Sequence, residues 1–327
     1  MTLLPDTARP LDLEDAVDAF DRILDGQVDD ADIAAFLLAL NERGETPAEI
    51  SAAAQAMRRR MLAVGAPEGA MDVCGTGGDG THSLNISTAV AFVVAAAGVP
   101  VAKHGNRAAS SRSGAADVLA ALGWHGELGF DRLEASLDDV GIAFLHAPRH
   151  HPALARVAPI HRALGRRTIF NLLGPLANPA NVKRQMVGVF APVWTAPVGE
   201  AAIALGSEAV LAVHGGGLDE IALHAPTLLV RNEGNGPVSS EFHPEAHGLR
   251  SQPLTAIAGG TPEENAAELL ALFAGRGRDA YRDIVVANAA GALTLAGRDW
   301  PAAIAEARDA LCSGAAADRL ARFLAFR

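Results

Sequence analysis

The sequence predicts an α/β protein with a small N-terminal all-helical domain, residues 1–66, and a larger α/β domain, residues 67–327, around a mostly parallel central sheet. Up to about residue 65, apolar residues recur at helical spacing. From residue 71 onward, short apolar runs alternate with helical stretches, which is typical of a parallel sheet. The 327 residues suit about two domains, and a composition half hydrophobic and one-fifth charged excludes disorder for most of the chain.

The first domain is predicted from two apolar helix faces and a helix-start signal. The faces are Val17, Phe20 and Leu24, then Ile33, Phe36, Leu37 and Leu40. They end at Gly26 and Gly44, and Thr46 to Glu49 supplies an N-cap, a first-turn proline and a capping-box glutamate. Short Ala-rich helices bury little area alone, so we expect packing or a dimer interface here. Part of 155–180 is a candidate to join this domain.

The second domain is predicted from five apolar runs that look like strands. They are Met71 to Cys74, Val99 to Ala102, Ile142 to Leu145, Met186 to Phe190 and Val210 to Val213. In parallel sheets ligands bind at the carboxyl ends of the strands. The residues that follow these runs are therefore the candidates for function.

The charges are unevenly distributed along the chain. The sequence has 27 Lys and Arg against 38 Asp and Glu, a formal net charge of −11. Two blocks, 80–116 and 140–199, contain no acid and carry +10, so the rest carries −21. A local anion site in an acidic protein explains this pattern, and chance patchiness is the alternative. The acidic remainder disfavours nucleic acid as a partner.

Other features bear on location. Cys74 and Cys312 are too few for a disulfide scaffold, and with no signal peptide recognised they indicate a reducing cytoplasm. The Ala-rich run 89–97 is too short to cross a bilayer, so no membrane partner is expected.

Two segments after the first strand suit an anion. Gly75 to Gly80 holds four glycines, which allow positive φ and expose N–H groups to a phosphate, although a plain glycine turn has the same composition. It lacks the Lys-Ser/Thr ending of a P-loop. Asn85 to Thr88 then begins a helix whose N-terminus favours an anion, and Ser87 Oγ could reach a metal that bridges phosphates.

Two further loops carry charged groups. Lys103 to Arg107, with Ser110, Ser111 and Ser113 behind it, follows the second strand. It is either an anion loop or a solvated surface loop. Asp219 and Glu220 follow the last strand; a divalent ion would relieve their repulsion, and hard oxygen ligands favour Mg²⁺, whereas a solvated acidic turn is the alternative.

Between these loops, His151 stands beside a proline, and residue chemistry alone assigns it no role. The stretch Asn171 to Leu176 is predicted to be a buried turn that fixes the relation between the domains. We expect it to support the site without touching the reaction.

Taken together, the motifs resemble the anthranilate phosphoribosyltransferase family, which joins anthranilate to phosphoribosyl pyrophosphate (PRPP) in tryptophan biosynthesis. The matching segments, in the family's order and spacing, are Gly75 to Asp79, Asn85 to Thr88, Lys103 to Arg107 with Ser110 and Ser111, Thr168 to Leu176, and Gly217 to Glu220. The resemblance covers nearly the whole chain. It implies a nucleoside phosphorylase/phosphoribosyltransferase-like fold, a homodimer through the helical domain, and Mg²⁺ as cofactor.

The resemblance also implies site residues. Those for PRPP are Gly75, Gly78, Asp79, Ser83, Asn85, Ile86, Ser87, Thr88, Lys103, His104, Gly105, Asn106, Arg107, Ala108, Ala109, Ser110, Ser111 and Ala115. Those for Mg²⁺ are Ser87, Asp219 and Glu220, and those near anthranilate are Gly75, Asn106, His151, His161 and Arg162.

One position departs from the family. Where the family has an anthranilate-binding Arg, this sequence has His161, followed by Arg162. A guanidinium grips a carboxylate with two hydrogen bonds and stays charged, whereas imidazole is only partly protonated near neutral pH. Either Arg162 replaces the missing group, or anthranilate binds less tightly, or the aromatic acceptor differs. We expect anthranilate to remain the substrate.

The implied reaction is attack of the anthranilate amine on C1 of the ribose with loss of pyrophosphate. No general base is assigned; Lys103 and Mg²⁺ are expected to stabilise the leaving charge. The nearest alternative is a pyrimidine nucleoside phosphorylase, which has a similar fold and uses free phosphate. Lys103 to Arg107 and the Asp219–Glu220 pair argue against it. A non-catalytic nucleic-acid binder is the alternative from another class.

Overall fold

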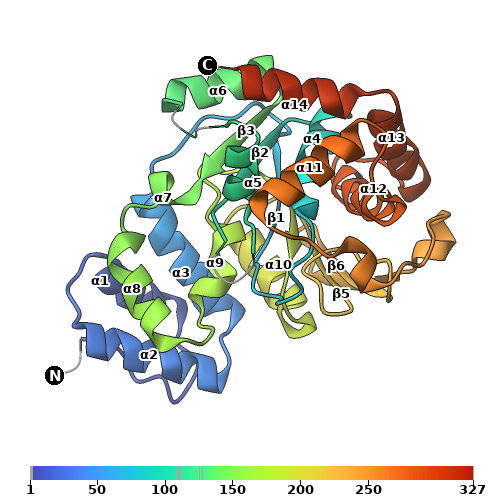
Figure 1. The fold of residues 1–327 in the computed structure, drawn as a ribbon. Coiled ribbons are helices and arrows are strands. Elements are labelled where there is room, and N and C mark those ends of the chain that lie inside the picture. The colour runs from blue at the N-terminus through green and yellow to red at the C-terminus, as the bar shows by residue number, and fades with distance from the viewer. Residues whose placement is uncertain (1–2, 109–111, 125, 127, 327) are drawn as a thin grey trace.

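The computed structural model describes residues 3–108, 112–124, 126 and 128–326. It confirms the predicted fold class. A group of helices formed mainly by the N-terminal segment lies beside a seven-stranded sheet with helices on both faces (Figure 1).

The N-terminal segment folds into three helices, α1 (Leu13–Leu24), α2 (Asp30–Arg43) and α3 (Pro47–Arg60). The capping box that starts α3 is confirmed, because Glu49 N donates to Thr46 Oγ1 and Thr46 N donates to Glu49 Oε2. Two later helices pack on this group: α8 (Leu154–Leu164) contacts α1 and α2, and α9 (Phe170–Leu176) contacts α3. These contacts involve parts of 155–180, while the domain boundary at residue 66 stays a prediction.

The sheet has the order β3-β2-β1-β4-β5-β6-β7. Its strands are β1 (Met71–Gly75), β2 (Val101–Gly105), β3 (Ile142–His146), β4 (Arg184–Gly188), β5 (Ala209–Gly215), β6 (Thr227–Asn232) and β7 (Pro237–Phe242). The first five run parallel, and β6 and β7 add an antiparallel edge. β1 lies between β2 and β4 and is the central strand of the five parallel ones, so its carboxyl end has a parallel neighbour on each side.

The other helices cover the two faces of the sheet and its ends. They are α4 (Ile86–Ala96), α5 (Ala115–Ala121), α6 (Phe130–Asp139), α7 (Ala147–His150), α10 (Thr195–Ala204), α11 (Pro262–Phe273), α12 (Asp279–Thr294), α13 (Trp300–Cys312) and α14 (Ala315–Ala325). Short 3₁₀ turns lie at Pro192–Trp194, Pro244–His247 and Leu254–Ile257. Among the described residues, no helix is long and apolar enough to cross a membrane.

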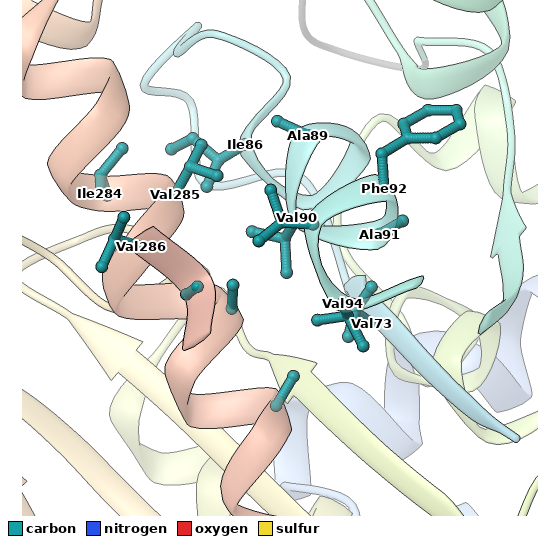
Figure 2. Close-up of a cluster of buried hydrophobic side chains, with 14 of the residues drawn as sticks. Val73, Ile86, Ala89, Val90, Ala91, Phe92, Val94, Ile284, Val285 and Val286 are labelled. Atoms are coloured by element: carbon teal, nitrogen blue, oxygen red, sulfur yellow. The ribbon is translucent and has the colours of Figure 1, made fainter. Parts of the chain in front are cut away.

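Helix α4, beside the expected site, is buried along most of its length. It packs against β1 and β2 on one side and against α12, α13 and α14 on the other. Figure 2 shows the apolar layer that results, with Ile86, Val90 and Val94 of α4 near Val73 of β1 and Ile284 and Val285 of α12. This burial explains the unbroken Ala- and Val-rich sequence of α4 and holds its N-terminus in place.

The stretch 171–176 is not a turn. It forms most of α9, which continues from Phe170 to Leu176 even though Pro175 lies inside the helix. Pro175 has no N–H to donate to Asn171 O, so α9 lacks one main-chain hydrogen bond there. α9 touches α3 on one side and β1 and β2 on the other. It therefore joins the helical group to the sheet, as expected of this segment.

Candidate active site

Three segments that are far apart in the sequence meet at the carboxyl ends of β1, β2 and β5. They are the glycine loop after β1, the N-terminus of α4, and the acidic segment after β5. Gly77 N donates a hydrogen bond to Asp219 Oδ2 at 2.8 Å, which ties the first segment to the third. The structure thus brings together groups that the sequence separates by more than 140 positions.

The glycine loop needs glycine for two different reasons. Gly77, Gly78 and Gly80 have φ of 66°, 74° and 75°, in the left-handed region that other residues rarely adopt. Gly75 is required by space, because a Cβ there would lie 2.1 Å from Asp219 Oδ2. Gly188 at the end of β4 is similarly constrained, with a Cβ reaching 1.6 Å from Asp219 O. Asp219 is therefore wedged between the ends of β1 and β4.

Asp219 and Glu220, the acid pair, are adjacent buried carboxyl groups that repel each other when both are charged. Burial, followed by the charge of Asp79, raises the pKa of Asp219 to about 7. Burial and the neighbouring Asp219 raise the pKa of Glu220 well above its usual range, while Lys103 and the N–H of Ser87 act in the opposite direction. A cation at this point would relieve the repulsion.

The protein supplies only part of a metal coordination sphere here. Within the ranges that the structure describes, no group of three or more His, Cys, Asp or Glu side chains is arranged to hold a metal ion. A Mg²⁺ ion usually keeps one or two carboxylates and takes its remaining ligands from water and substrate phosphates. The acid pair fits that mode of binding.

Lys103 brings a buried positive charge to the same place. Its side chain is 3 % exposed, and its ammonium donates to Val73 O at 2.8 Å and to Ser87 Oγ at 3.3 Å. A buried ammonium is costly unless it is paired. Here the carboxylate of Glu220 and that of Asp72 in β1 act as its counter-charges.

At the start of α4, most of the expected phosphate-binding groups already have partners. Asn85 Oδ1 accepts from Asn265 Nδ2 at 2.8 Å and from Ser113 Oγ at 3.3 Å, and Asn85 Nδ2 donates to Ser113 O at 3.2 Å. The side chain of Ile86 lies in the apolar core, away from the site, and its N–H donates to Leu84 O. The buried hydroxyl of Thr88, by contrast, has no hydrogen-bond partner among the described residues.

The loop after β2 is anchored at both ends. Asp117 of α5 accepts from Ala108 N and Gly114 N and forms an ion pair with Arg107 at 2.9 Å. Asn106 is exposed, and its carbonyl accepts from Ala116 N. Gly105 and Ala115 are close neighbours at the loop ends: a Cβ at 105 would lie 3.5 Å from that of Ala115. Ala109, Ser110 and Ser111 lie outside the described residues.

The ends of the glycine loop are fixed by neighbours. The carboxylate of Asp79 accepts from both the N–H and the hydroxyl of Thr81. Gly78 O accepts a hydrogen bond from Arg167, whose guanidinium also stacks 4.2 Å over the Phe190 ring. Ser83 forms an isolated β-bridge with Ala258.

His104 points away from the phosphate side of the site. Because β2 extends to Gly105, Lys103 and His104 must face opposite sides of the sheet. His104 Nδ1 lies 2.8 Å from Gly174 O, and its ring meets that of His151 edge to face at 5.1 Å. Burial lowers the pKa of His104 to about 3 and that of His151 to about 4, so both rings are neutral. His104 can therefore contribute only main-chain atoms to the side of the site where Lys103 lies.

The structure separates the two residues considered for the missing Arg. His161 is partly buried, and its Nε2 lies 3.0 Å from Asn171 Oδ1 at the start of α9. Arg162, the next residue of α8, is exposed. His161 thus faces α9, whereas Arg162 faces solvent.

Two contributors were missed from the sequence. Asp72 is fully buried in β1, where it accepts from His104 N at 3.1 Å and from Asn178 Nδ2 at 2.8 Å. A charged residue inside an apolar strand was the available signal. Arg167, which holds Gly78 O, gave no signal beyond its place in an acid-free block.

Comparison with known proteins identifies the family. Residues 6–61 match the helical bundle domain of a glycosyl transferase family, and residues 67–317 match its a/b domain. An anthranilate phosphoribosyltransferase from Novosphingobium aromaticivorans is 50% identical over 97% of this chain and 96% of its own length. The chain belongs to the anthranilate phosphoribosyltransferase family. Another family member, from Erythrobacter litoralis, is 49% identical over 99% of both chains.

Solved members of the anthranilate phosphoribosyltransferase family share the fold. The enzyme from Thermus thermophilus superimposes with a TM-score of 0.92 at 42% identity, covering 97% of this chain and 96% of that one. The enzyme from Saccharomyces cerevisiae, in complex with PRPP and Mg, gives a TM-score of 0.88 at 28% identity, covering 96% and 93%. The yeast enzyme has also been solved with 4-fluoroanthranilate.

Proposed function

We propose that this protein transfers the phosphoribosyl group of PRPP to the amine of anthranilate, giving N-(5-phosphoribosyl)anthranilate and pyrophosphate, in tryptophan biosynthesis. The observation that carries the proposal is the meeting of the acid pair, the buried ammonium of Lys103 and the glycine loop at one sheet edge. These groups suit a ligand that carries several phosphates and binds together with a cation. Relatives about half identical over nearly the full length support the same reaction.

Ser87, Asp219 and Glu220 are the residues that would hold Mg²⁺. They offer oxygen donors only, and the mutual repulsion of the carboxylates favours a divalent ion. Bound there, the ion would neutralise charge on the pyrophosphate. The yeast relative that carries PRPP and Mg supports this use of the site.

The remaining groups of this chain bind and orient the sugar and its phosphates. Free N–H groups of the glycine loop and the N-terminus of α4 favour the pyrophosphate, and Lys103 supplies a fixed positive charge as the leaving charge develops. The loop from Lys103 to Ser111 would bind the rest of the donor. Because Lys103 is held by Val73 O and Ser87 Oγ, it needs little reorganisation during the reaction.

The acceptor would lie on the other side of the glycine loop, against Gly75, Asn106, His151 and His161. The neutral rings of His104 and His151 make that side apolar enough for an aromatic ring. An aryl amine is an adequate nucleophile, so holding it in line with C1 matters more than proton removal. His161 then takes the place of the family's carboxylate-binding Arg, with Asn171 orienting its ring.

The protein is further proposed to be a cytoplasmic homodimer. A homodimer through the helical domain is part of the proposal and rests on the family resemblance. The free thiols of Cys74 and Cys312 suit a reducing cytoplasm. The division into residues 1–66 and 67–327 remains part of the proposal.

The test is a product analysis that separates the two related activities. The protein is incubated with anthranilate, PRPP and Mg²⁺, and in parallel with uridine and phosphate. Mass spectrometry should find phosphoribosylanthranilate together with pyrophosphate in the first mixture and no ribose 1-phosphate in the second. Phosphorolysis of uridine without phosphoribosylanthranilate would instead establish a pyrimidine nucleoside phosphorylase.

A further inference from the structure

A buried amide on a C-terminal helix holds the segment that carries the acid pair. Asn288 lies in the middle of α12, and its Oδ1 accepts a hydrogen bond from Ile221 N at 2.8 Å. Its Nδ2 donates to Ile221 O at 2.9 Å. Ile221 directly follows Glu220, so one side chain binds both main-chain polar groups of the residue next to the acid pair.

The orientation of this amide is fixed. Asn288 is 0 % exposed, and its Nδ2 also donates to Ile284 O at 2.8 Å, one turn earlier in α12. Rotating the amide by 180° would place its NH₂ against Ile221 N and its oxygen against two carbonyl oxygens. The three hydrogen bonds therefore allow one arrangement, and a buried amide in such a network is costly to disturb.

The side chain of Ile221 is held by the same helix. Gly291, nearly one turn after Asn288, is the part of α12 that Ile221 approaches: a Cβ there would lie 2.8 Å from Ile221 Cδ1. The side chain of Ile221 thus packs against α12 at Gly291, and its main chain is hydrogen-bonded to Asn288.

Helix α12 also supports the opposite half of the site. It packs along α4, whose first turn carries Ser87 (Figure 2). Tyr281, at the start of α12, donates to Asn85 O at 3.3 Å. One helix therefore sets the positions of both the N-terminus of α4 and the acidic segment.

We infer that Asn288 is a positioning residue for metal binding: by clamping Ile221, it fixes Asp219 and Glu220 opposite Ser87 against their mutual repulsion. The inference rests on the proposed function, because it concerns the same acid pair. It assigns a role in the reaction to a residue in the core of α12, remote in sequence from all the loop motifs.

The repulsion explains why a clamp is needed. Asp219 and Glu220 are adjacent and buried, Asp79 raises the pKa of Asp219, and Lys103 is the positive charge that acts on Glu220. Without a cation, the segment gains by moving the carboxylates apart or toward water. Two hydrogen bonds to Ile221 oppose that movement immediately after the pair, and Gly77 N opposes it at Asp219.

The test compares Asn288→Ala and Asn288→Leu with the unaltered protein and with Asn232→Ala. Leu has the same branching as the amide but lacks its hydrogen-bonding groups, and it leaves no cavity, so it remains informative if the smaller residue disrupts folding. Asn232 is a matched control: it is a buried amide at the end of β6 that accepts from Gly234 N, away from the site. Circular dichroism establishes that each variant is folded.

Two readouts are taken on each folded protein. Electron paramagnetic resonance measures Mn²⁺ bound in the presence of PRPP, and hydrogen exchange follows the amides of residues 216–222 without metal. In both Asn288 variants, we expect the Mn²⁺ dissociation constant to rise about tenfold or more, as for other residues that orient metal ligands. Exchange in 216–222 should quicken. KM for anthranilate should stay unchanged, and the Asn232 variant should match the unaltered protein.

Failure of this inference is distinct from failure of the proposed function. If the unaltered protein binds Mn²⁺ with PRPP and a folded Asn288 variant binds it within twofold as tightly, the positioning role is wrong and the function stands. If the Asn232 variant weakens Mn²⁺ binding equally, the effect is general destabilisation and the inference is again overturned. If the unaltered protein itself binds no Mn²⁺ with PRPP, the proposed function and this inference both fail.

Discussion

Gly75 and Asp219 occupy adjoining space that leaves no room for a side chain at residue 75. A Cβ on Gly75 would lie 2.1 Å from Asp219 Oδ2 and 2.8 Å from its Cγ. The glycine at the end of β1 is thus needed for the position of the acid pair, because Asp219 can reach the N–H of Gly77 only past a residue without a Cβ.

Gly75→Ala should therefore displace Asp219 and reduce Mg²⁺-dependent turnover by at least about 100-fold, an effect comparable to losing a metal-orienting group. Steady-state kinetics over a range of Mg²⁺ concentrations measures it. Gly199→Ala in α10 is the matched control, since a Cβ there meets only an ordinary contact at 3.9 Å. Equal activity of the two variants would show that Asp219 does not need this space.

The double variant Asp219→Asn with Glu220→Gln removes the charges and keeps the shapes. We expect Mg²⁺-dependent turnover to be abolished, because neutral amides are poor ligands for a hard divalent cation. The melting temperature without metal should stay the same or rise, since the repulsion between the carboxylates is gone. Near-native turnover of the double variant would end the metal role of the pair.

His161→Arg restores the guanidinium that the family uses for the carboxylate of anthranilate. KM for anthranilate should fall roughly tenfold, because two charge-assisted hydrogen bonds replace one. Arg162→Ala serves as the control and should leave KM unchanged, since Arg162 is exposed. A large rise of KM in Arg162→Ala would show that Arg162 moves into the site.

The same variant also tests the acceptor. If the unaltered protein barely turns anthranilate over while His161→Arg gains affinity many-fold, anthranilate is not the acceptor of this chain. A screen of aromatic amines by mass spectrometry of the phosphoribosylated products would then identify the acceptor.

The buried histidines predict a loss of stability in acid. The pKa values of His104 and His151 are lowered by burial to about 3 and about 4, below the ordinary value of 6.5. Between these values the unfolded chain binds more protons than the folded one, so stability falls as pH drops from about 6.5 towards 4.

Differential scanning fluorimetry at pH 7.5 and 5.0 measures this loss. His151→Gln should lose less melting temperature between the two pH values than the unaltered protein, by about 2–4 °C. His243→Gln, at an exposed histidine after β7, should behave like the unaltered protein. Identical pH dependence in all three proteins would contradict a neutral, buried His151.

The fold was largely predictable because its elements carry strong local signals. The capping box at Thr46 and Glu49 and the five apolar runs each correspond to an observed element. β6 and β7 were not predicted. β6 contains the short apolar run Leu228 to Val230, whereas five of the six residues of β7 are exposed and no apolar run marks it. α9 was predicted as a turn because Gly174 and Pro175 favour turns locally, whereas packing against α3 and the sheet stabilises the helix.

The site was predictable where residue type and chemistry coincide, as in the glycine loop and the acid pair. The side of the sheet that His104 faces follows from strand alternation only if β2 extends to Gly105. The predicted run ended at Ala102, so the sequence did not indicate this orientation. Asn288 could not be found in this way. Its role depends on a contact with Ile221, 67 positions away, which only the packing of α12 creates.

The most direct test of the central claim is the fluorescence of anthranilate in the presence of PRPP, with Mg²⁺ and with Mg²⁺ removed by a chelator. The site at the carboxyl ends of β1, β2 and β5 predicts a steady loss of fluorescence with Mg²⁺, accompanied by an equal amount of pyrophosphate, and a loss at least about 100-fold slower without it. Unchanged fluorescence in both mixtures, or equal rates in both, would contradict a Mg²⁺-dependent transfer of phosphoribose to anthranilate.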